Sequence, residues 1–140
     1  MYVISFQYPW TVAILKYHGV GRAKRLKIHC GGSVISTKHV LTASHCINQG
    51  IMEELVVVLG SEDPLGNDLK KQGLDFTIKD FVKHPEYKQS EVYFDIAILQ
   101  LDRTVVMSFD IHPICIPKKA NYDIDSMKGL PAWISGIALI

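Results

Sequence analysis

The arrangement of apolar residues along the chain predicts short β-strands rather than helices. Apolar side chains recur at every second position or form brief β-branched runs, and neither pattern has helical spacing. Six segments have this character and an ordinary strand length: residues 10–17, 27–36, 40–43, 55–59, 74–83 and 96–101. We therefore expect an all-β protein.

Turn-forming residues separate these segments. Gly, Pro and Asp cluster at 18–21, 60–66 and 84–86, where they favour tight changes of direction. Strands joined in this way predict a small barrel or sandwich. No repeat, low-complexity tract or linker divides the sequence, so we expect a single domain over 1–140. From residue 111 onward the pattern is less regular and prolines space out extended pieces, which indicates a connecting segment.

Composition and net charge limit the kinds of ligand and binding partner that we expect. The 140 residues are 48% hydrophobic and 21% charged, and a domain of this length buries roughly 68 to 70% of its unfolded surface. No metal or cofactor is therefore needed to form a core, and we expect none. The 15 basic and 14 acidic residues give a net charge of +1, which offers no bulk-charge argument for nucleic acid or an anionic membrane. Residues 1–6 lack the features of a signal peptide, and no apolar run could span a bilayer.

A local basic cluster follows the first predicted strand. Arg22, Lys24, Arg25 and Lys27 lie within six positions of one another. A solvated hairpin is the simplest interpretation of such a run. A rim that steers anions or substrate is the alternative.

Cys30, His45 and Cys46 make the densest chemical signal of the sequence. One interpretation is a soft-metal site of Cys and His ligands, with His29 and His39 in addition, although no C-x₂-C pair is present. The other is a Cys30–Cys46 disulfide that pins two neighbouring strands beside a functional His45. With Cys115 the cysteine count is odd, so one thiol is free or pairs outside the chain in an oxidising compartment.

Asp95 opens an apolar run, Asp95-Ile96-Ala97-Ile98-Leu99. A carboxylate at this position risks burial and needs a hydrogen-bond partner. A histidine is a natural one, because the carboxylate fixes the ring tautomer and stabilises the imidazolium. An exposed turn cap is the structural alternative.

Five motifs together resemble the N-terminal half of a chymotrypsin-like (S1, trypsin-family) serine protease domain. They occur in the family's order and cover nearly the whole chain: Tyr8-Pro9-Trp10, Cys30-Gly31-Gly32-Ser33, Leu41-Thr42-Ala43-Ser44-His45-Cys46, Asp95-Ile96-Ala97-Ile98-Leu99 and Ile111-His112-Pro113-Ile114-Cys115-Ile116-Pro117. The resemblance implies an antiparallel, six-stranded Greek-key barrel over about 8–117, the first of two barrels. Residues 118–140 would then lead toward the second.

The resemblance also assigns roles. It implies that His45 is the general base, that Asp95 orients it, and that Cys30 pairs with Cys46. Cys115 resembles a cysteine that tethers a propeptide or another distant segment. Protein or peptide substrates and an extracellular, secreted location follow from the same resemblance, although no signal peptide is visible.

The family's nucleophile motif, Gly-Asp-Ser-Gly-Gly, does not occur in these 140 residues. The region that would supply the oxyanion hole and specificity pocket is missing with it, and the match ends abruptly after Gly136, as in a truncated form. We expect half of a serine endopeptidase that is inactive alone. A non-catalytic, protease-like module that binds a protein partner is the alternative, and the metal-binding domain is a third hypothesis. The acidic segment 62–68 lies where some family members bind calcium, but it also suits a plain turn.

Overall fold

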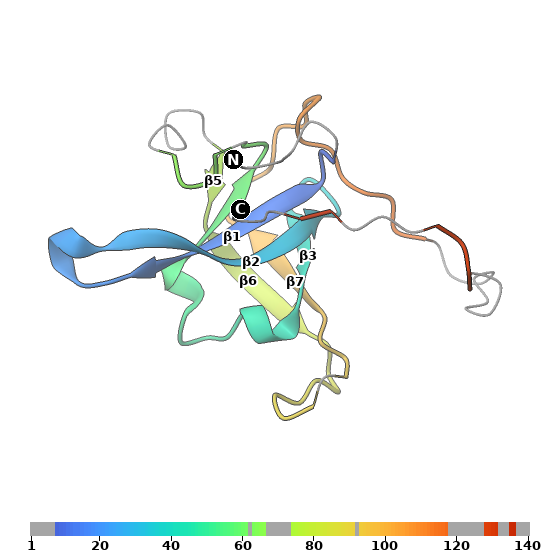
Figure 1. Ribbon diagram of the computed structural model, residues 1–140, viewed down its shortest axis with the longest axis horizontal. Coiled ribbons are helices and arrows are strands. Elements are labelled where there is room, and N and C mark those ends of the chain that lie inside the picture. Colours follow the sequence, from blue (N-terminus) through green and yellow to red (C-terminus); the bar gives the residue numbers. More distant parts are fainter. Residues whose placement is uncertain are drawn as a thin grey trace.

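The computed structural model describes residues 8–61, 63–66, 74–91, 93–117, 128–131 and 135–136. Seven strands and three short 3₁₀ turns make up its regular structure (Figure 1). The strands are β1 (Thr11–His18), β2 (Arg25–Val34), β3 (His39–Thr42), β4 (Leu55–Leu59), β5 (Asp75–Phe76), β6 (Ile78–Lys83) and β7 (Ala97–Leu101). The turns are η1 (Gly21–Ala23), η2 (Ser44–Cys46) and η3 (Met52–Glu54). Among these residues no helix is long and apolar enough to cross a membrane.

All seven strands belong to one antiparallel sheet in the order β5-β4-β1-β2-β3-β7-β6. The first and last strands of that order, β5 and β6, are neighbours in sequence, separated only by Thr77. The sheet therefore curls into a nearly closed barrel. The predicted all-β antiparallel class is confirmed.

The predicted strand 74–83 is divided in two by the structure, which is why there are seven strands instead of six. Its first part, β5, pairs with β4, and its second part, β6, pairs with β7. At the junction the Thr77 amide donates to Oδ1 of Asp102, and the Thr77 carbonyl accepts from the Asp102 amide. These two bonds turn the chain from one neighbour strand to the other at a corner of the barrel.

The barrel interior is filled by alternate residues of the strands. Along β7, Ala97, Leu99 and Leu101 are at most 2% exposed, whereas Ile98 is 40% exposed. This period of two is what a strand with one buried face requires. The same core includes the following residues from the other strands and loops: Val12, Ile14, Val34, Val40, Ile47, Leu55, Val57, Leu59, Phe76, Ile78, Val105 and Ile111.

The chain after β7 returns along the barrel. Gly60, which follows β4, has φ +61°, and a Cβ there would lie 2.5 Å from Cγ1 of Ile111. A residue without a side chain is needed for this close approach. Further on, the amides of His112 and Ile114 donate to the carbonyls of Pro9 and Val34, so this connecting segment adheres to the barrel.

Candidate functional site

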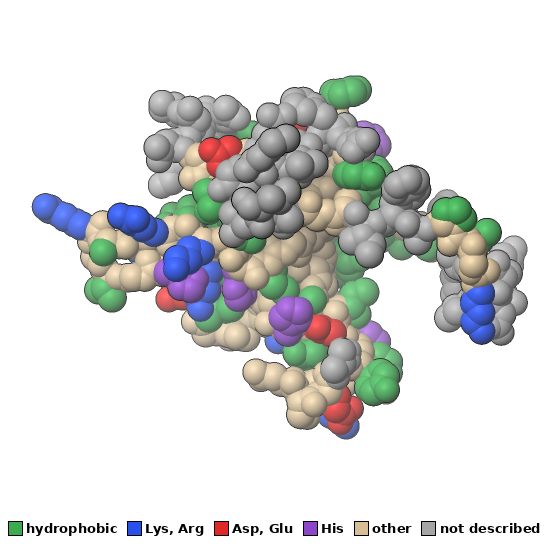
Figure 2. All heavy atoms as spheres, in the orientation of Figure 1, with side chains coloured by type: hydrophobic (Ala, Val, Ile, Leu, Met, Phe, Trp, Pro, Cys, Tyr) green, Lys and Arg blue, Asp and Glu red, His purple; other side chains and the backbone are tan. Residues whose placement is uncertain are grey.

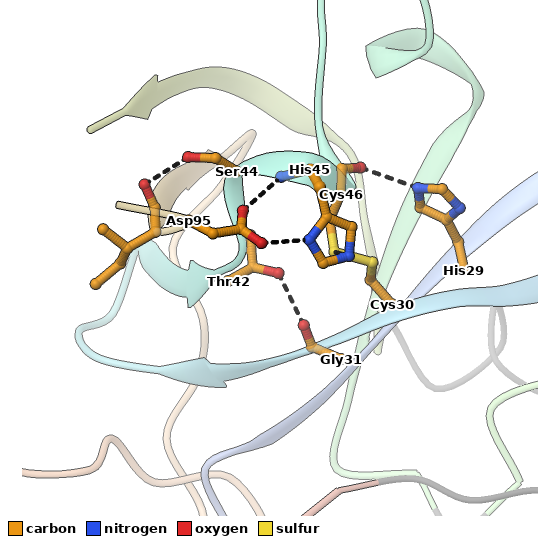
Figure 3. Close-up of polar contacts among 9 residues, drawn as sticks. His29, Cys30, Gly31, Thr42, Ser44, His45, Cys46 and Asp95 are labelled. Atoms are coloured by element: carbon orange, nitrogen blue, oxygen red, sulfur yellow. Dashed lines mark hydrogen bonds and ion pairs between the residues drawn. A yellow bond between two sulfur atoms is a disulfide. The ribbon is translucent and has the colours of Figure 1, made fainter. Parts of the chain in front are cut away.

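The candidate site lies where β3 ends and β7 begins, two strands that pair with each other in the sheet. η2 is separated from β3 only by Ala43 and carries His45, while Asp95 lies two residues before β7. Pairing of the strands therefore brings together two side chains that are 50 positions apart in sequence. Figure 3 shows the carboxylate of Asp95 facing the ring of His45.

Asp95 holds His45 through two hydrogen bonds. The backbone amide of His45 donates to Oδ1 over 2.8 Å, and Nδ1 of its ring lies 2.6 Å from Oδ2. Because a carboxylate only accepts, Nδ1 carries the proton and Nε2 of the neutral ring keeps its lone pair. The side chain of His45 is 62% exposed and that of Asp95 25%, so the basic nitrogen belongs to a ring that solvent can reach.

The same contacts determine the charge of Asp95. Its pKa lies below the ordinary value of 3.8, chiefly because the His45 side chain donates a hydrogen bond to the carboxylate. The His45 amide, and the positive charge of the ring when it is protonated, also lower this pKa, and partial desolvation opposes them. Asp95 is therefore ionised at neutral pH and can stabilise a positive charge on the ring.

The backbone around Asp95 is fixed on both sides. Phe94 has φ 58°, in the left-handed region that a bulky residue seldom adopts, and its ring stacks on that of His84 with centroids 4.7 Å apart. On the other side, the carbonyl of Ile96 accepts a 2.7 Å bond from the hydroxyl of Ser44, which is fully buried. Ser44 thus ties the turn that carries His45 to the segment that carries Asp95.

A disulfide lies next to His45. Cys30 on β2 is bonded to Cys46 on η2, and Nε2 of His45 lies 3.4 Å from Sγ of Cys46. A β-bulge opposite Ile14 and Leu15 leaves His29 without a partner on β1. Bulges re-aim side chains, and Nε2 of His29 lies 3.0 Å from the Cys46 carbonyl oxygen. Thr42 adds a hydroxyl bond to the carbonyl of Gly31.

These cysteines and His45 also meet the geometric condition for a metal cluster, since their ligand atoms lie within 4.8 Å of one another. A metal-binding cysteine must be a thiolate, however, and both sulfurs are committed to the disulfide. Of the two further histidines considered as ligands, His29 contacts the Cys46 carbonyl, and Nδ1 of His39 lies 2.8 Å from the hydroxyl of Ser36. The oxidised chain therefore offers the disulfide instead of a Cys/His metal centre.

Further predictions concern Cys115, the acidic segment 62–68 and the two ends of the sequence. Cys115 is exposed and has a free thiol. The proposed calcium segment 62–68 falls partly outside the described residues, at 62, 67 and 68. Its described part is a turn in which the amides of Leu65 and Gly66 donate to Oδ1 and the carbonyl of Asp63. Residues 1–6 and most of 118–140 also lie outside the described part.

Several supporting residues have no signal that sequence reasoning could have used. The hydroxyls of Thr42 and Ser44 and the ring of His29 all bond to backbone carbonyls of other segments. Such bonds depend on where two segments meet, which no local pattern records.

Comparison with known proteins gives a consistent result. The family described as Trypsin matches residues 4–138. Over 129 residues the chain is 32% identical to "Serine protease filzig" of Drosophila melanogaster and 33% identical to "Venom serine protease Bi-VSP" of Bombus ignitus, with 92% of this chain covered in each case. It is also 33% identical to "Proclotting enzyme" of Tachypleus tridentatus, with 86% covered. The chain spans only 7%, 35% and 33% of these three relatives. From its sequence and its barrel, this chain belongs to the trypsin family of serine proteases.

Proposed function

We propose that this chain supplies the general base and its orienting carboxylate to a trypsin-like serine endopeptidase. The observation that carries the proposal is the double hydrogen bond from His45 to Asp95, which leaves Nε2 of the ring unprotonated. Nε2 would take the proton of a serine hydroxyl as it attacks a peptide carbonyl, and would return it to the leaving amine. Asp95 would keep the ring in the required tautomer and stabilise the imidazolium.

The nucleophile must come from outside the 140 residues, because no Gly-Asp-Ser-Gly-Gly motif occurs in them. Ser44, the serine adjacent to His45, is fully buried and its hydroxyl is bonded to the Ile96 carbonyl. It is therefore not available for attack. We propose that the chain alone hydrolyses neither peptides nor esters at a rate that depends on His45, and that 8–117 is the first barrel with 118–140 leading to the part that carries the serine.

A secreted location and protein substrates belong to the same proposal. A disulfide persists in oxidising compartments, and Cys30 and Cys46 are joined by one. The exposed thiol of Cys115 would be the attachment point for a propeptide or another segment. Peptide mapping of the protein purified from its source under non-reducing conditions tests the attachment, and a Cys115 disulfide with Cys30 or Cys46 would contradict it.

The catalytic proposal is tested by a chimera. The chain would be joined after Gly136 to the C-terminal half of the Bombus ignitus relative and assayed for peptide cleavage and for labelling by a fluorophosphonate. We expect the chimera to be labelled and active, the 140-residue chain to be unlabelled, and His45→Ala to lower kcat by about 10⁴-fold or more, the size of loss known for serine-protease triads. Cleavage by the chimera that persists unchanged in His45→Ala would refute the role of His45.

A further inference from the structure

Three potential metal ligands lie together at the candidate site, and the proposed catalytic function uses only one of them. Sγ of Cys30, Sγ of Cys46 and a ring nitrogen of His45 all lie within 4.8 Å of one another. In the oxidised chain the two sulfurs are bonded to each other, so neither is a thiolate that can bind a metal. A dithiol reductant changes this, because it converts the bonded pair into two thiols beside the same imidazole.

His45 presents the nitrogen that a metal would need. Its Nδ1 lies 2.6 Å from Oδ2 of Asp95, so Nδ1 carries the proton and Nε2 has the free lone pair. Nε2 is also the nitrogen that lies 3.4 Å from Sγ of Cys46, close to the separation of about 3.6 Å between a nitrogen and a sulfur ligand of one tetrahedral zinc ion. Metal-binding histidines commonly donate their other N–H to a carboxylate, which fixes the ring and raises its basicity.

Contacts that involve no sulfur hold the two cysteines near the ring. The hydroxyl of Thr42 on β3 donates to the carbonyl of Gly31 on β2, the residue after Cys30. Nε2 of His29, also on β2, lies 3.0 Å from the carbonyl oxygen of Cys46 on η2. Figure 3 shows both contacts around the disulfide. Reduction therefore breaks one link among several, and the two thiols stay beside the imidazole.

We propose that the reduced chain has a zinc site formed by the thiolates of Cys30 and Cys46 and by Nε2 of His45. Thiolate and imidazole ligands together suit Zn²⁺, whereas Ca²⁺ and Mg²⁺ take oxygen ligands. The two thiolates balance the charge of the ion. Since the side chain of His45 is 62% exposed, solvent reaches this corner of the barrel and supplies water as the fourth ligand.

The site forms in two chemical steps. The dithiol reductant gives two electrons and two protons to the disulfide, whose S–S bond breaks while the reductant forms its own disulfide. Zn²⁺ then replaces the two thiol protons, which pass to solvent. Zinc on Nε2 occupies the lone pair that the catalytic role of His45 requires. That last consequence rests on the proposed function, whereas the binding of the ion does not.

Cobalt binding tests the proposal without any catalytic assay. Tetrahedral Co²⁺ bound to thiolates gives charge-transfer absorption in the near ultraviolet and ligand-field bands in the visible range. The chain would be reduced, separated from the reductant without oxygen and titrated with Co²⁺. We expect one tetrahedral Co²⁺ per reduced chain, displaced by Zn²⁺, and no such absorption from the oxidised chain. Zn²⁺ should also raise the urea midpoint of the reduced chain but not that of the oxidised chain.

Variants identify the ligands. Asp95→Asn should raise the Kd for Zn²⁺ by about 10- to 100-fold, as the loss of a carboxylate behind a metal-binding histidine does. His45→Ala and Cys30→Ser each remove a ligand and should raise Kd at least as much. An effect of Cys30→Ser without one of His45→Ala would mean that the thiols bind the ion without the imidazole, which contradicts the proposed site.

Matched controls exclude metal uptake elsewhere on the surface, where Figure 2 shows histidine side chains at several places. His112→Ala removes an exposed histidine and Cys115→Ser removes the exposed free thiol. Both should leave Kd unchanged. The proposal is overturned if the reduced chain, folded or unfolded, gives no cobalt–thiolate absorption, if the oxidised chain binds the ion equally well, or if either control weakens binding as much as the ligand variants.

Discussion

The site around His45 and the β1–β2 hairpin use polar side chains in opposite ways. At the site, one carboxylate accepts two bonds from His45, and buried or half-buried side chains bond to the backbone of neighbouring segments. Along the β1–β2 hairpin, Lys16 faces Lys27, and within the described part of the chain only Lys16 of these two has a carboxylate nearby, with its Nζ 3.5 Å from Glu54. The first arrangement fixes a geometry from within the barrel, whereas the second leaves most of its charge to solvent.

Of the changes considered below, removing the disulfide beside the site should have the largest effect on stability. Replacing both Cys30 and Cys46 by Ser frees a loop of sequence separation 16, and the chain-entropy estimate for such a loop is a loss of roughly 3 kcal/mol in the free energy of unfolding. Urea denaturation measures the loss. Cys115→Ser is the control and should leave the midpoint unchanged, since this thiol is exposed and free. Equal losses in the two variants would contradict the structural role of the bond.

Two adjacent glycines on β2 provide a sharper probe of the packing beneath the site. A Cβ at Gly32 would lie 2.7 Å from the carbonyl oxygen of Leu41, whereas at Gly31 the nearest atom is 3.8 Å away. Gly32→Ala should therefore cost about 1–3 kcal/mol, as crowding of a packed interior does, and Gly31→Ala should be tolerated. Thermal unfolding of the two variants measures the difference. A Gly31→Ala loss as large as that of Gly32→Ala would contradict the pairing of β2 with β3 described above.

Acid should remove the contribution of the Asp95 carboxylate to the free energy of unfolding. Its pKa is lowered in the folded state, so the folded protein binds fewer protons than the unfolded chain in the range between the two pKa values. The contribution is present in full above the unfolded pKa of about 3.9 and is lost as pH falls through the folded one. We expect Asp95→Asn to be less stable than the parent at neutral pH, with the difference shrinking on acidification.

Urea unfolding of the parent and Asp95→Asn across this range measures the effect. Glu86→Gln, which removes an exposed carboxylate in the loop before Asp95, is the control and should show little difference at any pH. A difference between Asp95→Asn and the parent that stays constant from neutral pH to strong acid would mean that the carboxylate charge contributes nothing.

The hairpin should respond least, and in the opposite direction. Arg25→Ala removes one exposed cation from a hairpin that also carries Arg22, Lys24 and Lys27, so the free energy of unfolding should stay within about 0.5 kcal/mol of the parent or rise slightly. Differential scanning calorimetry at low ionic strength is the appropriate measurement, because salt screens the repulsion. A clear loss of stability would show that Arg25 has a structural role instead.

Sequence reasoning located most strands because alternation is a local property. β4 was placed at its observed ends, 55–59, where a run of branched apolar residues comes directly before the turn-forming segment 60–66. The corner at Thr77 was not foreseen, since the apolar pattern continues through it and the change of partner depends on Asp102, 25 positions away. A periodic pattern shows that a segment is extended but does not show which neighbours it pairs with.

In the candidate site, too, some residues could be selected from the sequence and others could not. His45 and Asp95 were selected by their residue types and by the family resemblance, and their catalytic roles stay predictions. The bonds that frame them from His29, Thr42 and Ser44 could not be anticipated, because each ends on a backbone carbonyl whose position is set by the closed sheet. Phe94 is likewise ordinary in sequence, and its left-handed backbone follows from the turn that the chain makes there.

The 50 positions between His45 and Asp95 also set an order of events during synthesis. At about 5–20 residues per second, Asp95 leaves the ribosome roughly 3–10 s after His45. Cys46 follows Cys30 by only 16 positions, so both ends of the loop that carries His45 are available before Asp95. The imidazole therefore acquires its tautomer late, when β7 joins β3, and the Nδ1 proton resonance of His45 is an indicator of the final closure of the sheet.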